Sequence, residues 1–266
     1  MNLSYNLHMP EPAQIDRDGA VAIIRMLRPE KHNAFNRELS GAVMGALEAL
    51  AADEDVNVVV LTGSGTAFSA GADMTEAVAA IDENGRSDGM AQTIERALRF
   101  PKPLIACVNG FAYGGGALLA TVCDIRIASE TAAFRFPGAV YGLVVGGSQL
   151  PRVIGSAYAK ELLFTGRVVH TEEALRIGLV NRTALSGNVE AETMEMARQI
   201  AANSPEALVA TKEVVDRATN ADEGVRREIE WNRELRASSE HHARFRAAAE
   251  RVAARGSETG HDRPIK

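Results

Sequence analysis

The sequence predicts an α/β fold with a helical C-terminal segment, and three observations lead to this expectation. Short, continuous apolar runs such as Val56–Thr62 and Leu104–Val108 are typical of strands covered on both faces. Each run is followed by a glycine-rich loop, and the second loop leads directly into a helical pattern. Beyond Gly155 the apolar residues recur mainly at helical spacing.

The elements can be placed in chain order, with a polar leader before the first of them. Apolar character and β-branching predict the strands, helical periodicity predicts the helices, and Arg28–Phe35 is expected to be a loop. We expect strands at 19–26, 56–62, 104–108, 125–128 and 133–136, and helices at 36–52, at the end of 74–100 after a polar flap, and from the second glycine loop to 122. Further helices are expected at 156–164, 171–177, 189–202, 205–219 and about 222–254. The predicted organisation is an α/β core at 1–200, a helical segment at 201–255 and a disordered tail at 256–266.

Composition excludes several classes of function. The 266 residues carry a formal net charge of −6, whereas a nucleic-acid-binding surface usually shows a basic excess. No apolar run approaches the length of about 18 residues that suggests a membrane span, and the N-terminus lacks the pattern of a signal peptide. We therefore expect a cytoplasmic protein without a nucleic-acid or membrane partner.

The two cysteines are expected to be buried, reduced thiols. Cys107 and Cys123 each lie in an apolar run, and they form no C-x-x-C pair. Neither has histidine neighbours in the sequence, so we expect no metal site.

The two glycine loops are the places where chemistry is expected. Asn109–Gly116 and Gly63–Asp73 each follow a buried strand. Glycines let the backbone approach a ligand closely, and the first turn of a helix has unpaired N–H donors at the positive end of its dipole. Two such loops on neighbouring strands could each give one N–H group to a single carbonyl oxygen that gains negative charge.

The glycine loops match neither of two common glycine motifs, although either loop alone could be a simple turn. A dinucleotide-binding loop would need G-x-G-x-x-G, but Gly110–Gly116 has the spacing G-x-x-x-G-G-G. A nucleophile elbow would need G-x-S-x-G, and the serines in question stand in Gly63–Gly65 and Gly147–Gln149 without that spacing.

Taken together, the loops and three further blocks resemble the crotonase, or enoyl-CoA hydratase/isomerase, superfamily. The blocks are RPEKHNAFN (28–36), VVVLTGSGTAFSAGADM (58–74), PKPLIACVNGFAYGGGALLATVCDIRIAS (101–129), ELLFTGRVVHTEEALRIGLVN (161–181) and ANSPEALVATKEVV (202–215). The resemblance implies a spiral of repeated ββα units that acts on an acyl-CoA thioester. It also implies homotrimers or dimers of trimers, with the helical segment 201–255 packed between subunits. No cofactor is implied, since CoA is part of the substrate.

The resemblance also implies the site residues. Ala72 and Gly115 would donate the two backbone N–H groups of an oxyanion hole that stabilises an enolate. The loop at 31–34 would hold the nucleotide end of CoA, and the stretch 70–75 would pass beside CoA. The substrate contacts implied in these two segments are Lys31, Ala34, Ala70, Asp73, Met74 and Thr75.

The sequence departs from the family at the two catalytic carboxylates. Where family hydratases have glutamates that hold and activate water, this chain has Leu118 and Gly138. The loop Gly142–Gln149 is also about two residues shorter than the family pattern. Leu118, Gly138 and Tyr141 are therefore expected to line an apolar acyl pocket, together with Leu143 and Val144. Losing both acids should make ordinary hydration slow, since general acid–base catalysis contributes about 10²–10⁴-fold.

No replacement base is evident from the sequence. The six histidines lie outside the glycine loops and are expected at the surface, and Tyr141 is expected to pack against other side chains. Asp73 is expected to cap a helix and Asp124 to be structural, while the flap acids Glu76, Asp82 and Glu83 are expected on a solvated face. Two hypotheses follow: an enzyme that forms an enolate from an acyl-CoA, or a non-catalytic acyl-CoA-binding protein.

Overall fold

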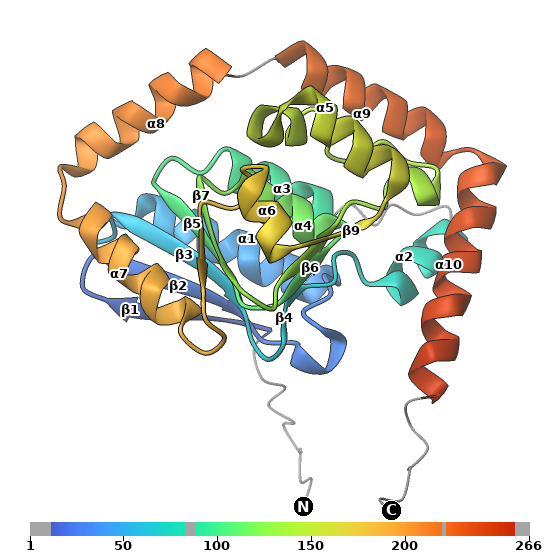
Figure 1. The fold of residues 1–266 in the computed structure, drawn as a ribbon, viewed down its shortest axis with the longest axis horizontal. Coiled ribbons are helices and arrows are strands. Elements are labelled where there is room, and N and C mark those ends of the chain that lie inside the picture. The colour runs from blue at the N-terminus through green and yellow to red at the C-terminus, as the bar shows by residue number, and fades with distance from the viewer. Residues whose placement is uncertain (1–11, 83–88, 220–221, 259–266) are drawn as a thin grey trace, which may run out of the picture.

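The computed structural model describes residues 12–82, 89–219 and 222–258, which form two β-sheets with surrounding helices (Figure 1). The larger sheet contains, in spatial order, β1 (Ala13–Asp18), β2 (Val21–Met26), β3 (Val58–Gly63), β5 (Leu104–Val108), β7 (Ile125–Ser129) and β10 (Arg182–Ala184). The smaller sheet contains β4 (Ala67–Ser69), β6 (Phe111–Tyr113), β8 (Ala133–Arg135) and β9 (Val168–His170). The β1–β2 and β8–β9 pairs are antiparallel, and the other pairs are parallel.

The chain repeats one ββα unit, as the resemblance predicted. The pairs β3–β4, β5–β6 and β7–β8 each give one strand to the larger sheet and the next strand to the smaller one. The first pair leads to α2 (Met74–Asp82) and α3 (Gly89–Leu98), the second to α4 (Gly115–Val122), and the third to α5 (Leu150–Thr165). Because each unit crosses between the sheets in the same way, the β3–β4 and β5–β6 loops lie next to each other.

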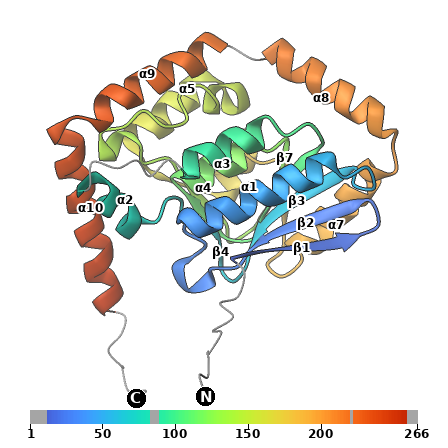
Figure 2. The same cartoon turned by 180° about the vertical axis from the view of Figure 1, so that it is seen from behind.

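Helices cover both faces of the larger sheet (Figures 1 and 2). On one face, α1 (Arg37–Ala52) lies beside α3 and α4, and its fully buried Leu39 and Leu47 belong to the main core. On the other face lies α7 (Val189–Ala201), whose Met194 packs in a second cluster. The β-branched strands thus have apolar neighbours on both faces, as their continuous apolar sequence predicted.

The structure corrects the N-terminal part of the prediction. No strand is expected in the polar leader, but 13–18 form β1, which pairs along its whole length with β2 across a turn at Gly19. This strand is mostly exposed, with Ile15 at 41%. An edge strand with little to bury has no apolar alternation, so periodicity could not reveal it.

The helices after 150 also differ from expectation. α5 begins at Leu150 rather than at 156, because its first turn lies before a kink at Gly155, where φ is +73°. The single helix expected at about 222–254 is two helices, α9 (Asp222–Arg236) and α10 (Ser239–Glu258). Ser238 lies between them, and its Oγ accepts a hydrogen bond from His241 N–H at 3.1 Å. α10 therefore passes the boundary drawn at 255, and 259–266 lie outside the described residues.

The remaining helices were located as expected. α6 (Thr171–Arg176) follows β9, and α8 (Pro205–Thr219) stands apart from the rest of the molecule in both views (Figures 1 and 2). α8 has no buried residue, and Lys212 ties it to the core through Asp124 at 2.8 Å. α9 lies along α5, and α10 runs beside α2 (Figure 1). In the segment 74–100, where a flap followed by one helix was expected, the flap prediction is wrong for Met74–Asp82, which form α2; α3 is the expected helix, and 83–88 lie outside the described residues.

Three general properties concern the described residues only. None of the helices there is both long enough and apolar enough to cross a membrane. No group of three or more His, Cys, Asp or Glu side chains is placed to hold a metal ion in the described ranges. Cys107 and Cys123 are buried free thiols, as predicted, and burial raises both pKa values, that of Cys123 to about 12.

Candidate functional site

The two glycine loops are in direct contact through Gly71 and Gly115. Gly71 has a φ of +91°, and a methyl group added there would lie 2.7 Å from the Tyr113 carbonyl oxygen and 2.9 Å from the Gly115 nitrogen. The next glycine, Gly116, is equally constrained, since a methyl group there would lie 2.3 Å from the Ser69 carbonyl oxygen. Glycine is therefore required at these positions because the two backbones touch.

Both predicted donors lie at this contact with their N–H groups unused. Ala72 forms a bridge with Phe35, in which Phe35 N–H donates to Gly71 O at 2.7 Å and Asp73 N–H donates to Phe35 O at 2.9 Å. This pattern turns the N–H of Ala72 away from Phe35. Gly115 is the first residue of α4 and precedes the first intrahelical bond, from Leu118 N–H to Gly114 O. Within the described residues neither N–H has an acceptor, and both residues are partly exposed.

An ion pair holds the first donor loop against the predicted CoA loop. Arg28 approaches Asp73 at 3.3 Å, with both side chains about 15% exposed, and its guanidinium also donates to the carbonyl oxygen of Ala34. Asn33 is fully buried in a left-handed conformation, and its amide donates to Ser64 O and Ala67 O at 2.9 and 2.8 Å. The loop 28–35 and the loop 63–73 thus form one connected unit.

The other predicted substrate contacts lie on this unit. Asp73 accepts hydrogen bonds from Thr75 N–H at 3.1 Å and Glu76 N–H at 3.5 Å, which confirms that it caps a helix, here α2. Ala70 N–H donates to His32 O at 2.9 Å. Lys31 and Thr75 are exposed, Ala70 and Met74 are partly exposed, and Ala34 is buried. Their contact with CoA stays a prediction.

A cavity of about 320 Å³ lies beside the donors, between α1, α2 and α3. Met90 lines it and also covers Gly115, because a methyl group on Gly115 would lie 2.6 Å from Met90 Cγ. Phe35, the bridge partner of Ala72, lines the same cavity. Glu76 contributes a carboxylate, which accepts a hydrogen bond from Arg37 N–H at 2.9 Å. Of the other flap acids, the Asp82 side chain and Glu83 lie outside what the structure describes.

The two positions without carboxylates do not line this cavity. Leu118 is one turn after Gly115 in α4 and is 7% exposed. Gly138 is buried at the start of the 3₁₀ helix η2 (Ala139–Tyr141), and a methyl group there would lie 3.1 Å from both Leu143 O and Val145 Cβ. Position 138 is therefore crowded by the shortened loop that follows.

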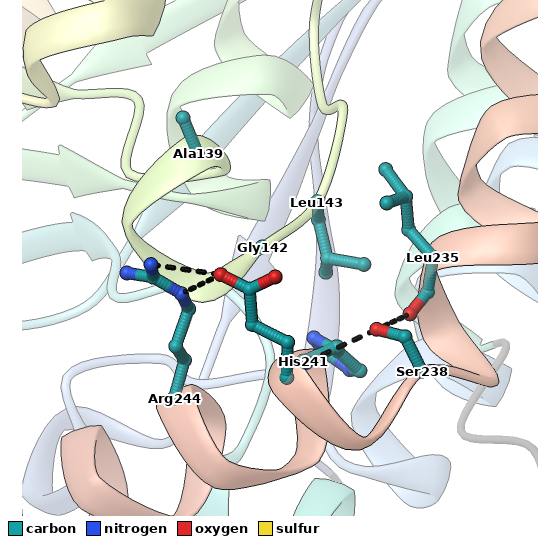
Figure 3. Close-up of a pocket in the computed structure, with 8 residues that line it drawn as sticks. Ala139, Gly142, Leu143, Leu235, Ser238, His241 and Arg244 are labelled. Carbon is teal, nitrogen blue, oxygen red and sulfur yellow. Dashed lines mark hydrogen bonds and ion pairs between the residues drawn. The ribbon is translucent and has the colours of Figure 1, made fainter.

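The histidine prediction is wrong for His241. It was expected at the surface, but it is 5% exposed and lines a cavity of about 230 Å³ between η2 and the α9–α10 corner (Figure 3). Its Nδ1 lies 2.7 Å from Tyr141 O, and burial lowers its pKa. The ring of Tyr141 packs edge-on against Phe245 of α10 at 5.7 Å, which supports the expected packing role. The lining of this cavity includes neither predicted donor.

Other acids and thiols near α4 are engaged elsewhere. Asp124 accepts from Leu104 N–H and Lys212 Nζ, each at 2.8 Å, so its role is structural as predicted. Glu130 accepts from Ser186 N–H at 3.1 Å. The raised pKa of Cys123 keeps its thiol protonated near neutral pH.

Two residues next to the site were missed by sequence reasoning. Glu228 and Asn232 of α9 bind the backbone of the shortened loop: Gly146 N–H donates to Glu228 at 2.7 Å and Val144 N–H donates to Asn232 at 3.0 Å. Their spacing of four residues on a helix was the only signal, and it does not reveal what the helix face contacts.

Comparisons with known proteins point to one family. A family model described as enoyl-CoA hydratase/isomerase matches residues 16–256. A putative enoyl-CoA hydratase of Thermus thermophilus is 40% identical over 204 residues, which cover 74% of this chain and 81% of that protein. The crystal structure of an enoyl-CoA hydratase/isomerase from Pseudoalteromonas atlantica is similar with a TM-score of 0.82 and 28% identity, covering 90% of this chain and 97% of that one. A monofunctional enoyl CoA isomerase from M. smegmatis is similar with a TM-score of 0.70 and 32% identity, covering 88% and 98%.

Proposed function

The chain belongs to the enoyl-CoA hydratase/isomerase family of enzymes, and we propose that it binds an acyl-CoA thioester between its two glycine loops. The N–H groups of Ala72 and Gly115 polarise the thioester carbonyl and stabilise the enolate that forms when a proton leaves the α-carbon. The observation that supports this proposal is the contact of Gly71 with Gly115, beside which neither N–H has an acceptor among the described residues.

The two N–H donors would bind an enolate oxygen more strongly than the carbonyl oxygen of the neutral thioester. Negative charge gathers on the oxygen as the enolate forms, so fixed donors bind it more strongly than they bind the ground-state carbonyl. One such donor can contribute about 3–4 kcal/mol to the transition state. The position of Gly115 in the first turn of α4 adds the favourable end of a helix dipole.

The connected loops at 28–35 and 63–73 are the proposed CoA site. Lys31 is exposed at the end of the 3₁₀ helix η1 (Pro29–Lys31), where its charge suits a phosphate group of the nucleotide. The segment from Ala70 to Thr75 passes along the rest of CoA in this proposal. The Arg28–Asp73 ion pair fixes the distance between the two segments.

The reaction proposed is proton transfer at the enolate rather than fast hydration. Leu118 and Gly138 offer water neither an acceptor nor an acid. The names of the similar proteins include both a hydratase and an isomerase. Isomerisation needs no bound water, but a base must take a proton from the α-carbon and return it at the γ-carbon, and Glu76, the carboxylate that lines the neighbouring cavity, is proposed for this role. Double-bond isomerisation of an enoyl-CoA is therefore the reaction that this site supports best.

We also propose that the helical C-terminal segment mediates assembly into trimers or dimers of trimers. α8 has no buried residue and exposes Val209, Val214 and Val215, the latter two at 66% and 54%. Exposed apolar side chains on a helix that stands apart from the rest of the molecule are typical of an interface. Light scattering should show an oligomer for the wild type and a smaller species for Val214→Lys. A monomeric wild type would contradict this assembly.

Two measurements test the site. Calorimetry should show tighter binding of acetoacetyl-CoA than of free CoA, because only the thioester offers the oxygen. Incubation of a saturated acyl-CoA in D₂O should then show protein-dependent exchange of the α-protons, followed by mass spectrometry. Equal affinity for thioester and free CoA would overturn the proposed oxyanion hole. Preferential binding without exchange would instead support a non-catalytic acyl-CoA-binding protein.

A further inference from the structure

The shortened loop after η2 is held by one face of helix α9. Glu228 accepts hydrogen bonds from Gly146 N–H and Ser148 N–H, both at 2.7 Å, and from the Ser148 hydroxyl. One helical turn later, Asn232 accepts from Val144 N–H at 3.0 Å and donates to the Val144 carbonyl oxygen. Two side chains of the C-terminal segment thus bind the backbone of a loop about 80 residues earlier in the chain.

This loop forms the wall next to the first missing carboxylate. A methyl group on Gly146 would lie 3.6 Å from Cδ1 of Leu118. Leu118 in turn lies three residues after the predicted donor Gly115, on the same side of α4. Glu228 therefore binds the N–H of Gly146, and Gly146 is also the residue that the side chain at position 118 faces.

Three hydrogen bonds engage the carboxylate of Glu228. They come from the N–H groups of Gly146 and Ser148 and from the Ser148 hydroxyl. Two of the donors lie just before α5, so the carboxylate also lies near the positive end of this helix. A group so fully engaged is suited to holding a loop rather than to exchanging protons.

We propose that Glu228 is a positioning residue that determines the acyl-binding wall at Leu118. It fixes the shortened loop against Leu118, and it occupies the N–H donors that a carboxylate at position 118 would need. This inference rests on the proposed function in one respect, since the wall is taken to face the acyl group. Its consequence is specific: a glutamate at 118 is incompatible with Glu228, because two carboxylates would compete for the same donors and repel each other.

The first test separates shaping of the site from stabilisation of the fold. Glu228→Ala and Glu228→Gln are compared with Glu234→Ala, which removes an exposed acid from the same helix. For each variant, affinities for acetoacetyl-CoA and free CoA are measured by calorimetry, and the melting temperature by circular dichroism. We expect Glu228→Ala to lose roughly tenfold in thioester affinity with free-CoA affinity unchanged, Glu228→Gln to lose less, and Glu234→Ala to lose nothing.

The outcomes distinguish this inference from the proposed function. A lower melting temperature with an unchanged ratio of the two affinities would overturn it, because Glu228 would then support only the fold. If the unmodified protein shows no preference for the thioester, the oxyanion proposal fails first. Should Glu228→Ala not fold, Glu228→Gln carries the same comparison, since its amide oxygen still accepts a hydrogen bond.

The second test is independent of ligands. Urea denaturation is measured for the wild type, Leu118→Glu, Glu228→Gln and the double variant. We expect Leu118→Glu to be strongly destabilised and Glu228→Gln to relieve much of that loss, so that the double variant is more stable than Leu118→Glu. Additive effects of the two substitutions would show that Glu228 and position 118 do not share donors, and would overturn the inference.

Discussion

Gly71 lies against Gly115 so closely that a methyl group on Gly71 would come within 2.9 Å of the Gly115 nitrogen. This contact joins a loop of the first ββα unit to the first turn of α4 in the second unit. Neither glycine has room for a Cβ atom, and their contact brings the N–H groups of Ala72 and Gly115 close to each other. The contact therefore links the fold to the proposed chemistry.

Substitution of Gly71 by alanine should abolish the preference for thioesters. The added Cβ would clash with Tyr113 O and Gly115 N and would also sit at a φ of +91°. The matched control is Gly187→Ala, where φ is +88° but nothing lies within 4 Å. Both variants should lose about 1–2 kcal/mol of stability from the backbone conformation, and only Gly71→Ala should lose thioester binding by calorimetry. Equal binding losses in both variants would contradict the prediction.

Removal of one donor should have the same effect without a change of loop. Gly115→Pro deletes the N–H at the first position of α4, where a helix tolerates proline well. Because any Cβ at 115 would crowd Met90, Gly115→Ala is the control that keeps the N–H. Thioester affinity should fall at least tenfold more in the proline variant than in the alanine variant. Similar affinities in two folded variants would place the carbonyl elsewhere.

The sequence predicted the fold where strands are buried and failed where burial is slight. β5 was placed with its observed bounds because Leu104–Val108 is fully buried and continuous. β1 was missed because its exposed residues carry no apolar pattern, and the break between α9 and α10 was missed because Ser238 begins α10 through a local hydrogen bond, accepted from His241 N–H. A pattern of apolar residues indicates which side chains of an element are buried, but it indicates little about where the element begins or ends.

The candidate site shows the same division. The glycine contacts could be anticipated, since glycine at strand ends signals close backbone approach. Glu228 and His241 could not, because each meets the site from the C-terminal helices at a distance in sequence of 80 residues or more. Their contacts depend on how α9 and α10 fold back, which no local pattern specifies.

Burial of His241 should make stability depend on pH. Burial is the main cause of its lowered pKa, and nearby His242 and Arg236 lower it further, while the bond to Tyr141 O opposes the shift. The unfolded chain then binds more protons than the folded one, so stability is full above the ordinary histidine pKa of about 6.5 and falls as the pH drops towards the folded value.

The variant His241→Gln should remove this part of the pH dependence, because glutamine does not titrate and its amide can still donate to Tyr141 O. Urea denaturation at pH 7.5 and 5.5 should show a smaller loss of stability for His241→Gln than for the wild type. Exposed His170 supplies the control, since His170→Gln should behave as the wild type does. Glu240 and Arg244 line the same cavity and are present in both proteins, so the comparison isolates position 241. Equal losses in wild type and His241→Gln would refute the assignment.

We expect crotonyl-CoA hydration to be slow, because hydration depends directly on the two carboxylates that are missing at 118 and 138. Relative to family members with both acids, we expect a rate lower by about 10²–10⁴-fold. In the Glu228→Gln background, which removes the competing carboxylate, restoring Glu at 118 and 138 together should raise the rate above either single change, since the two acids act as a unit. The structure identifies an obstacle at 138, where even a Cβ would lie 3.1 Å from Leu143 O. Gly138→Ala measures the effect of this crowding alone, by its melting temperature and thioester affinity.

A fast unmodified enzyme would contradict this prediction without ambiguity. The proton transfers would then have to come from another group, and Glu76 is the described acid best placed, because it lines the same cavity as Met90, which covers Gly115, and Phe35, which pairs with Ala72. Glu76→Gln would decide the matter, with Glu48→Gln, an exposed acid near the other end of α1, as its control. Loss of hydration in Glu76→Gln alone would assign the acid–base function to Glu76, and the reaction proposed for the site would change from isomerisation to hydration.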